Sequence, residues 1–381
     1  MVRTGRRARI RYSTMNSHCF DVIIVGAGIS GLVAAGTVAR HGQKVALVAA
    51  GPGPFVLRSG CLRAGEFIQS RATHELREAV AFFQEMTQAA GYPFEGDISG
   101  ECLLPTILGG FHSVALAPRT LWNAEPRNGT TNVIVGIREL SCFDESFMAE
   151  RLNEQTHGLG LACTFTARQI SLAHIFGPTA TALRIAARFD SDPAFRSELV
   201  RSLRLEASGF ARIFVPGILG LQSSAKLLVQ FERDLGCLLC ELPTLPPSVP
   251  GLRLFHRLMS YLCQIGVELL EGFPVANLQI HDGCCTELQI ASPGHFMNLR
   301  GECVVLSAGQ DSTRLFGAAC AGHDQQMRPV TFSGSVLAWN VFDAESGAND
   351  GAENRGDVAE ILAGYRAGNL AAATRGHYAA R

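Results

Sequence analysis

The sequence predicts an α/β fold in which parallel strands alternate with helices. A run at 21–25, rich in Val and Ile, leads through a glycine turn and a helical stretch to a second apolar strand at 44–48. Strand–helix pairs follow at 132–154 and 211–235. The 381 residues are 47% hydrophobic, so the chain can bury a large core and is expected to form two domains.

The first unit carries glycines at the G-x-G-x-x-G spacing. Gly26 would make the tight turn, Gly28 would let the backbone approach a phosphate, and Gly31 would let the helix pack closely on the strand. The helix opens with Ile29 and Ser30, and its free N–H groups and positive dipole end favour an anion. The sequence therefore predicts a Rossmann-like nucleotide site at these five residues. A βαβ turn that binds nothing is the alternative.

The end of the second strand lacks the residue that usually recognises adenosine. An acidic side chain is expected there, because it can accept a hydrogen bond from a ribose hydroxyl. The sequence has Ala49, Ala50 and Gly51 instead. Phosphate recognition is predicted, whereas the recognition of adenosine is in doubt.

Apolar spacing and turn residues predict the later elements in order. Helices are expected at 66–90, 144–154, 178–189, 193–205, 225–235, 252–265 and 357–373, and strands at 132–135, 161–175, 211–215, 238–242, 266–270, 275–280 and 302–306. Asp144 is a plausible N-cap for its helix. A strand that arrives late in the chain at a small-residue turn, here Gly309, fits a two-dinucleotide-binding flavoprotein.

Composition excludes several classes of protein. Lys and Arg number 33 against 34 Asp and Glu, a net charge of −1, so nothing indicates nucleic-acid binding. The 12 cysteines are scattered and are typical of reduced thiols in a cytoplasmic protein. Cys237 and Cys240 have the C-x-x-C spacing, but in an apolar strand they would point to opposite faces, so no metal site is expected.

The ends of the chain and its apolar runs also bear on its location. Residues 1–17 carry five arginines and are expected to be a disordered tail, or to precede a true start at Met15. No apolar run reaches the ~18–20 residues needed to span a bilayer, so any membrane association would require a partner.

Two side chains are candidates for chemistry. His112 lies in a glycine-flanked loop, where proton transfer or ordinary loop packing are both open. Arg253 follows a stretch with four prolines in eight residues, which fixes much of the backbone. Because a rigid loop can aim a side chain at a ligand, Arg253 is predicted to point into the cleft between two domains and to face an anionic group of flavin or substrate. The alternative is a solvated arginine on a helix face.

Several motifs together resemble one family. They are LPTLPPSVPGLRL at 242–254, VGAGISG at 25–31, RSGCL at 58–62 and SGSVLA at 333–338. With these motifs the chain resembles the B subunit of anaerobic glycerol-3-phosphate dehydrogenase over roughly residues 18–373. Compared with that family, the chain looks internally shortened between Gln310 and Phe332.

The resemblance implies a flavoprotein with FMN, or alternatively FAD, that oxidises sn-glycerol 3-phosphate to dihydroxyacetone phosphate. Electrons would reach quinone through an FAD-bearing A subunit and an iron–sulfur C subunit that anchors the complex to the inner face of the cell membrane. The expected cofactor contacts then include Ser59, Gly60, Gly309, Gly334 and Ser335. The alternatives are a non-catalytic electron-relay or scaffold subunit, or a flavin oxidoreductase of another substrate.

The resemblance and the element order together predict a discontinuous arrangement. Residues 1–17 form the tail, residues 18–95 and 255–381 form the Rossmann-like flavin-binding domain, and residues 96–254 form an inserted α/β domain.

Overall fold

The computed structural model describes residues 18–63, 73–98, 100, 102–281, 284–292, 294–307, 330–332, 335–337 and 357–378. Its helices are α1 (Ile29–Arg40), η1 (Gly53–Val56), α3 (His74–Ala89), α4 (Arg119–Trp122), α5 (Glu145–Gly158), α6 (Ala173–Phe176), α7 (Ala182–Ser191), α8 (Pro193–Ala207), α9 (Ala225–Leu235), α10 (Val249–Gln264) and α12 (Val358–Tyr378). Its strands are β1 (His18–Val25), β2 (Val45–Ala49), β3 (Phe94–Gly96), β4 (Cys102–Pro105), β5 (Phe111–Val114), β6 (Leu116–Pro118), β7 (Thr130–Ile137), β8 (Cys163–Ile170), β9 (Arg212–Pro216), β10 (Leu238–Leu242), β11 (Glu268–Glu271), β12 (Val275–His281), β13 (Cys284–Ser292), β14 (His295–Leu306), β15 (Val330–Phe332) and β16 (Ser335–Leu337).

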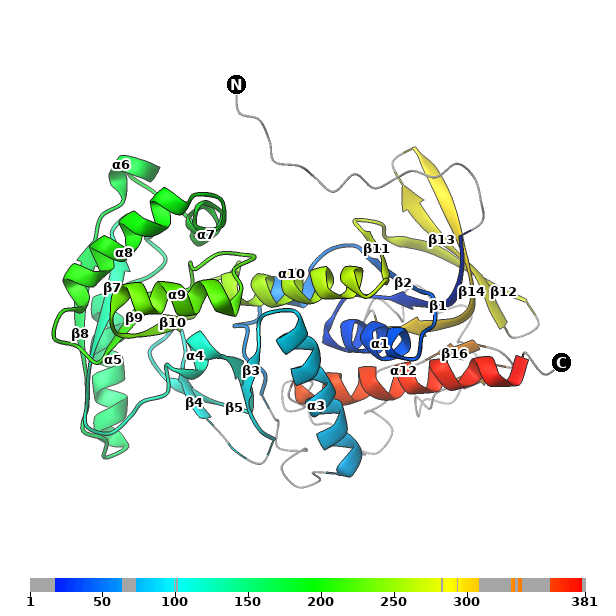
Figure 1. Cartoon of the computed structure of the whole chain (residues 1–381), viewed down its shortest axis with the longest axis horizontal. Coiled ribbons are helices and arrows are strands. Elements are labelled where there is room, and N and C mark those ends of the chain that lie inside the picture. The colour runs from blue at the N-terminus through cyan, green and yellow to red at the C-terminus, as the bar shows by residue number, and fades with distance from the viewer. Residues whose placement is uncertain are drawn as a thin grey trace.

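Two sheets with parallel strands lie toward opposite ends of an elongated molecule, and α10 runs between them (Figure 1). Helices cover each sheet, and a smaller group of short strands with α4 lies between them. The predicted α/β fold class is confirmed. The predicted limits of the flavin-binding and inserted domains stay a prediction.

The first sheet has six strands in the order β11-β2-β1-β14-β13-β12. β11, β2, β1 and β14 are parallel, and β13 and β12 are added antiparallel. Val25 at the end of β1 is in register with Val48 of β2 and with Leu306 of β14. The carboxyl ends of these strands therefore meet at one edge, where parallel sheets of this kind bind ligands.

The second sheet has the order β10-β9-β7-β8 and is parallel throughout. The bounds of α5, α8 and α9 differ little from the expected ranges 144–154, 193–205 and 225–235. As predicted, Asp144 caps α5, and it does so by accepting a 2.9 Å hydrogen bond from the Phe147 N–H. One detail differs: the strand was expected at 132–135, but β7 continues through Gly136 to Ile137. A Cβ at Gly136 would meet the Glu145 side chain, so the glycine makes room for the helix.

Helix α12 packs along α1 beneath the first sheet (Figure 1). Two of its glycines face α1 at close range. A Cβ on Gly364 would lie 2.2 Å from the Ser30 carbonyl oxygen, and one on Gly368 would lie 2.6 Å from the Thr37 Cβ. The last helix thus packs closely against α1 and fixes the start of that helix.

Candidate functional site

The glycine turn at the end of β1 has the geometry that the spacing predicts. Gly26 has φ +104°, a left-handed conformation that favours glycine. A Cβ on Gly31 would lie 1.9 Å from the Gly26 carbonyl oxygen, so only glycine allows this contact between helix and turn. Among the described residues, no atom lies within 4 Å of a Cβ built on Gly28. Within this part of the chain, the space in front of the N-terminus of α1 is therefore open on the Gly28 side.

The first turn of α1 is tied to the end of β14. The hydroxyl oxygens of Ser30 and Ser307 lie 2.5 Å apart and share a hydrogen bond. The Ser307 N–H also donates to the Val25 carbonyl at 2.8 Å. Ser307 is a site residue that the sequence does not reveal, because its partner is 277 positions away. Its only local signal is its place directly after a buried strand.

The Ser59–Gly60 segment lies against the proline-rich stretch at 243–250, which we call the proline loop. Gly60 has φ +88°, and a Cβ there would lie 2.8 Å from the Cβ of Pro250. The Ser248 N–H donates to the Val56 carbonyl at 2.7 Å. Two motifs that are almost 200 residues apart in the sequence are therefore packed against each other.

The same segment is joined to the start of α12 by charges. Arg58 forms ion pairs with Asp357, at 3.1 Å, and with Glu360. The backbone N–H of Arg63 donates to Asp357 at 3.0 Å. Burial raises the pKa of Glu360, against the opposing effect of Arg58. These contacts fix the turn that carries Ser59 and Gly60.

His112 lies in the short strand β5, opposite Leu104 of β4, and not in the expected loop. Its Nδ1 is buried and has no hydrogen-bond partner within the part of the chain that the structure describes. Burial, and then the positive charge of Arg63, lower the pKa of the imidazole. A neutral ring with a free nitrogen can accept a proton, so its suggested proton-transfer role remains a proposal.

Arg253 does not face a cleft, and that prediction is wrong. The residue has no exposed surface, and its Nη1 and Nη2 donate to both carboxylate oxygens of Glu241 at 2.8 and 2.9 Å. Nε donates to the Gly220 carbonyl at 2.7 Å, and Nη1 donates to the Tyr92 hydroxyl at 3.2 Å. The charge is therefore balanced inside the protein. The helix also begins earlier than expected, at Val249.

Glu241 completes this buried group, which also includes Thr120. Burial alone would raise the pKa of the Glu241 carboxyl, but the Arg253 guanidinium outweighs it and holds that pKa below its usual value. The Thr120 hydroxyl donates a further 2.6 Å hydrogen bond to Glu241. The group links α10, β10, α4 and the chain before β3, and it therefore joins the second sheet to α10 and to the short strands beside it.

A sequence profile described as an FAD binding domain matches residues 21–65 and 68–272. The chain belongs to this family. The match spans the glycine turn, the Ser59–Gly60 segment and the proline loop, which are the three motifs that the structure brings to the edge of the first sheet or beside it.

Curated relatives of this chain carry the name of the B subunit of anaerobic glycerol-3-phosphate dehydrogenase. The protein of Glaesserella parasuis is 24% identical over 302 residues, which cover 69% of each chain. The protein of Pectobacterium atrosepticum is 26% identical over 323 residues, which cover 76% of this chain and 74% of the relative. The family resemblance predicted from the sequence motifs is confirmed.

Two solved enzyme structures are only remotely similar to this chain. L-Amino acid deaminase from Proteus myxofaciens has a TM-score of 0.34 at 15% identity, and the match covers 82% of this chain and 50% of the deaminase. L-Proline dehydrogenase from P. horikoshii has a TM-score of 0.36 at 11% identity, covering 81% and 58% of the two chains. This chain thus spans about half the length of these structures.

The glycine turn of this chain fits a flavin phosphate. The first N–H groups of a helix have no partner within the helix, and at α1 they lie beside the open space at Gly28. Ala49 ends β2 as a buried residue, so the usual ribose-binding acid is absent from that position. Gly309 and Gly334 lie outside the described residues. Ser335 begins β16, but the structure does not describe its side chain.

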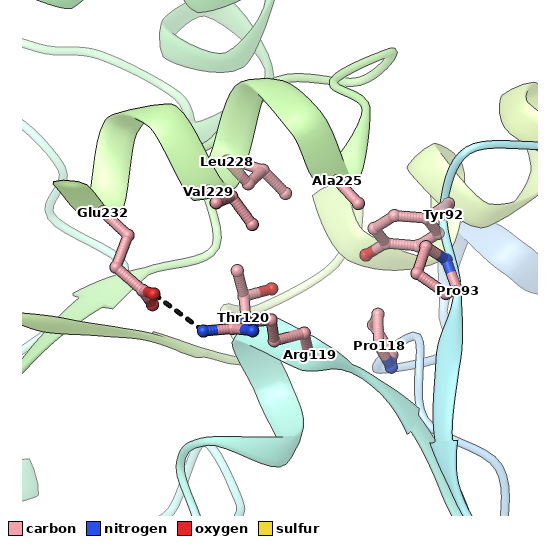
Figure 2. A pocket seen from close by; sticks show the side chains of 9 residues that line it. All are labelled: Tyr92, Pro93, Pro118, Arg119, Thr120, Ala225, Leu228, Val229 and Glu232. Atoms are coloured by element: carbon pink, nitrogen blue, oxygen red, sulfur yellow. Dashed lines mark hydrogen bonds and ion pairs between the residues drawn. The ribbon is translucent and has the colours of Figure 1, made fainter. Parts of the chain in front are cut away.

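A small cavity lies beside the buried Arg253 group. Figure 2 shows Arg119 reaching Glu232 near one end of it, Tyr92 near the other, and Thr120 between them. The ion pair between Arg119 and Glu232 measures 2.9 Å. The cavity volume is about 20 Å³, which accommodates a single water molecule. This cavity is therefore too small for a substrate or a cofactor.

The C-x-x-C cysteines show no sign of a redox or metal pair. Cys237 and Cys240 are free thiols, and the buried Cys240 sulfur donates to the Asn123 carbonyl at 3.2 Å. Within the described ranges, no three His, Cys, Asp or Glu residues are arranged to hold a metal ion. None of the described helices combines the length and apolar character needed to cross a membrane.

Proposed function

We propose that this chain is the flavin-dependent B subunit of an anaerobic glycerol-3-phosphate dehydrogenase. In this function sn-glycerol 3-phosphate is oxidised to dihydroxyacetone phosphate, and the electrons pass to quinone. The observation that carries the proposal is the match to the curated relatives over 69–76% of the chain. The open glycine turn, which suits a flavin phosphate, supports it.

The chain's own residues suggest a division of roles. The N-terminus of α1 would hold the flavin phosphate through the N–H groups of Ile29, Ser30 and Gly31. A bound flavin supplies a hydride acceptor for alcohol oxidation. His112 would take the hydroxyl proton, since its neutral ring keeps an unpartnered buried nitrogen. Ser59 and Gly60 would shape the flavin side of the site.

The names of the relatives, which describe one subunit of a larger enzyme, support a multisubunit assembly. We propose that the chain joins an FAD-bearing A subunit and an iron–sulfur C subunit, and that the C subunit holds the complex at the inner face of the cell membrane. Cell fractionation with and without the C subunit tests this arrangement. Sedimentation with membranes in the absence of any partner would contradict it.

The activity is tested by spectroscopy of the purified chain under anaerobic conditions. Oxidised flavin absorbs visible light, and reduction removes this absorption. We expect sn-glycerol 3-phosphate to bleach the flavin, whereas glycerol at the same concentration, which lacks the phosphate, should not. Bleaching by neither compound, even with the other subunits present, would reject glycerol-3-phosphate oxidation.

A second candidate is an electron-relay or scaffold subunit, and the position of Arg253 favours it. The arginine predicted to bind the anionic substrate is already neutralised by Glu241. In this case the isolated chain would hold flavin that glycerol 3-phosphate does not bleach, and bleaching would require the A subunit. The experiment with and without that subunit separates the two functions.

The identity of the flavin is the finer part of the proposal. The missing acid at Ala49 favours FMN, which has no adenosine, whereas the match to the FAD binding domain family favours FAD. Chromatography of the released cofactor distinguishes the two.

A further inference from the structure

The carboxyl end of β11 places an acid beside the position where β2 lacks one. Glu271, the last residue of β11, is in parallel register with Ala49, the last residue of β2. Neighbouring strands lie about 4.8 Å apart, so the backbones of these residues are adjacent. The missing acidic group of the second strand is therefore present one strand further along the sheet.

The side chain of Glu271 also lies on the relevant face. Leu47 and Ala49 belong to the hydrophobic cluster that contains α1, and Leu269 packs against the same cluster. Leu270 belongs to the cluster on the opposite face. Because side chains alternate along a strand, Glu271 shares the face of Leu269 and Ala49, which is the face of α1.

The backbone around Glu271 is held firmly. The N–H of Gly272 donates to the Ala49 carbonyl at 2.8 Å, and the N–H of Phe273 reaches the same oxygen at 3.3 Å. The Glu271 side chain is exposed at the strand end. It is therefore anchored through its backbone and accessible to a ligand.

The sheet order gives this carboxylate a suitable distance from the phosphate turn. β2 separates β11 from β1, so Glu271 lies two strands, or about 10 Å, from the end of β1. A carboxylate at the helix N-terminus itself would repel a bound phosphate. The Glu271 carboxylate lies two strands away, where the ribose attached to a bound diphosphate would extend.

We propose that Glu271 accepts hydrogen bonds from the ribose hydroxyls of the adenosine half of FAD, and so replaces the acid absent from β2. This inference rests on the proposed flavin function and identifies the cofactor as the dinucleotide. The structure also allows a simpler role, in which Glu271 is a charge that prevents further pairing at an edge strand.

The test compares flavin binding by the cofactor-free protein, measured by flavin fluorescence, for wild type and Glu271→Gln. We expect the variant to bind FAD about ten- to a hundredfold more weakly, the usual loss for a hydrogen bond to a charged group. Binding of FMN, which lacks adenosine, should stay unchanged. The matched control is Glu268→Gln at the other end of β11, which should leave the binding of both flavins unchanged.

The possible outcomes distinguish a failure of the Glu271 assignment from a failure of the proposed flavin function. Equal FAD affinity in wild type and Glu271→Gln would overturn the assignment and favour the edge-strand role. An equal loss of FAD and FMN binding would also overturn it, because the effect would then come from the fold. Wild-type protein that binds FMN alone would overturn the assignment while leaving the flavin function intact. Binding of neither flavin would reject the proposed function itself.

Discussion

The polar groups at the carboxyl ends of the parallel strands differ between the two sheets. At the first sheet, no atom of the described residues lies within 4 Å of a Cβ built on Gly28, and within this part of the chain the N-terminus of α1 faces open space. At the second sheet, Glu241 near the end of β10 is fully buried and bonded to Arg253 and Thr120. The first edge thus leaves a helix N-terminus without a close contact among the described residues, whereas the second is closed by an internal ion pair.

Breaking the closed edge should have the largest effect. Arg253→Met would leave the buried Glu241 carboxylate without its counter-charge, and we expect a loss of about 3–5 kcal/mol in the free energy of unfolding. Urea denaturation followed by circular dichroism measures this loss. The double variant Arg253→Met/Glu241→Leu should recover most of it, because it removes both charges.

Arg119→Met provides the matched control, since Arg119 pairs with Glu232 but is exposed. That surface pair should contribute less than about 1 kcal/mol. If Arg253→Met costs no more than Arg119→Met, the buried group does not stabilise the packing of α10 against the second sheet.

The difference between the two edges also explains what the sequence could predict. β1, α1 and the glycine turn were predictable because their signal is local, with each glycine's task set by neighbours within a few positions. The partners of Arg253 are not local: Glu241 is 12 residues away and Tyr92 is 161 residues away. Charge and proline spacing suggested a rigid, aimed arginine, but could not identify an internal carboxylate as its target.

The antiparallel strands beside the first sheet show a second limit. The sequence does not predict β13, and only the last five residues of β14 were expected, although β14 begins at His295. The first half of β14 alternates polar and apolar residues weakly, because only one of its faces is covered. Register is a third limit, since the pairing of Glu271 with Ala49 depends on how two distant strands align.

At the open edge, the largest loss of stability should come from Gly31→Ala. The added Cβ would lie 1.9 Å from the Gly26 carbonyl oxygen, so the helix or the turn must shift. We expect a loss of about 1–3 kcal/mol in the free energy of unfolding, as for other overpacked sites. Gly28→Ala is the control and should cost much less. Equal losses in the two variants would show that the turn is not as closely packed as the structure indicates.

Replacing His112 should have a smaller effect on the free energy of unfolding, and this effect should depend on pH. Burial and Arg63 lower its pKa in the folded state, so the unfolded chain binds more protons just below the ordinary value of 6.5. Wild-type protein should therefore lose stability relative to His112→Asn as the pH falls through 6.5, by at most about 1.4 kcal/mol per pH unit for one proton. Denaturation midpoints at pH 7.5, 6.5 and 5.5 measure the difference. His74→Asn, which removes an exposed histidine, is the control, and an equal pH dependence in both variants would show that His112 is not perturbed.

Gly28→Val should change the stability least, and that is what makes it informative about the open edge. Gly28 has φ −68° in an extended conformation that valine also adopts, and its Cβ would meet no atom of the described residues within 4 Å. Loss of the glycine cap should cost no more than about 1 kcal/mol in the cofactor-free protein. The two valine methyl groups would nevertheless fill the space in front of the α1 N–H groups, and we expect flavin affinity to fall by at least about a hundredfold, or about 2.7 kcal/mol. Denaturation of the cofactor-free protein and flavin titration of the same preparation measure both quantities. Full flavin occupancy in Gly28→Val would place the phosphate elsewhere, whereas a large loss of stability would mean that this edge is packed internally, like the edge that carries Glu241.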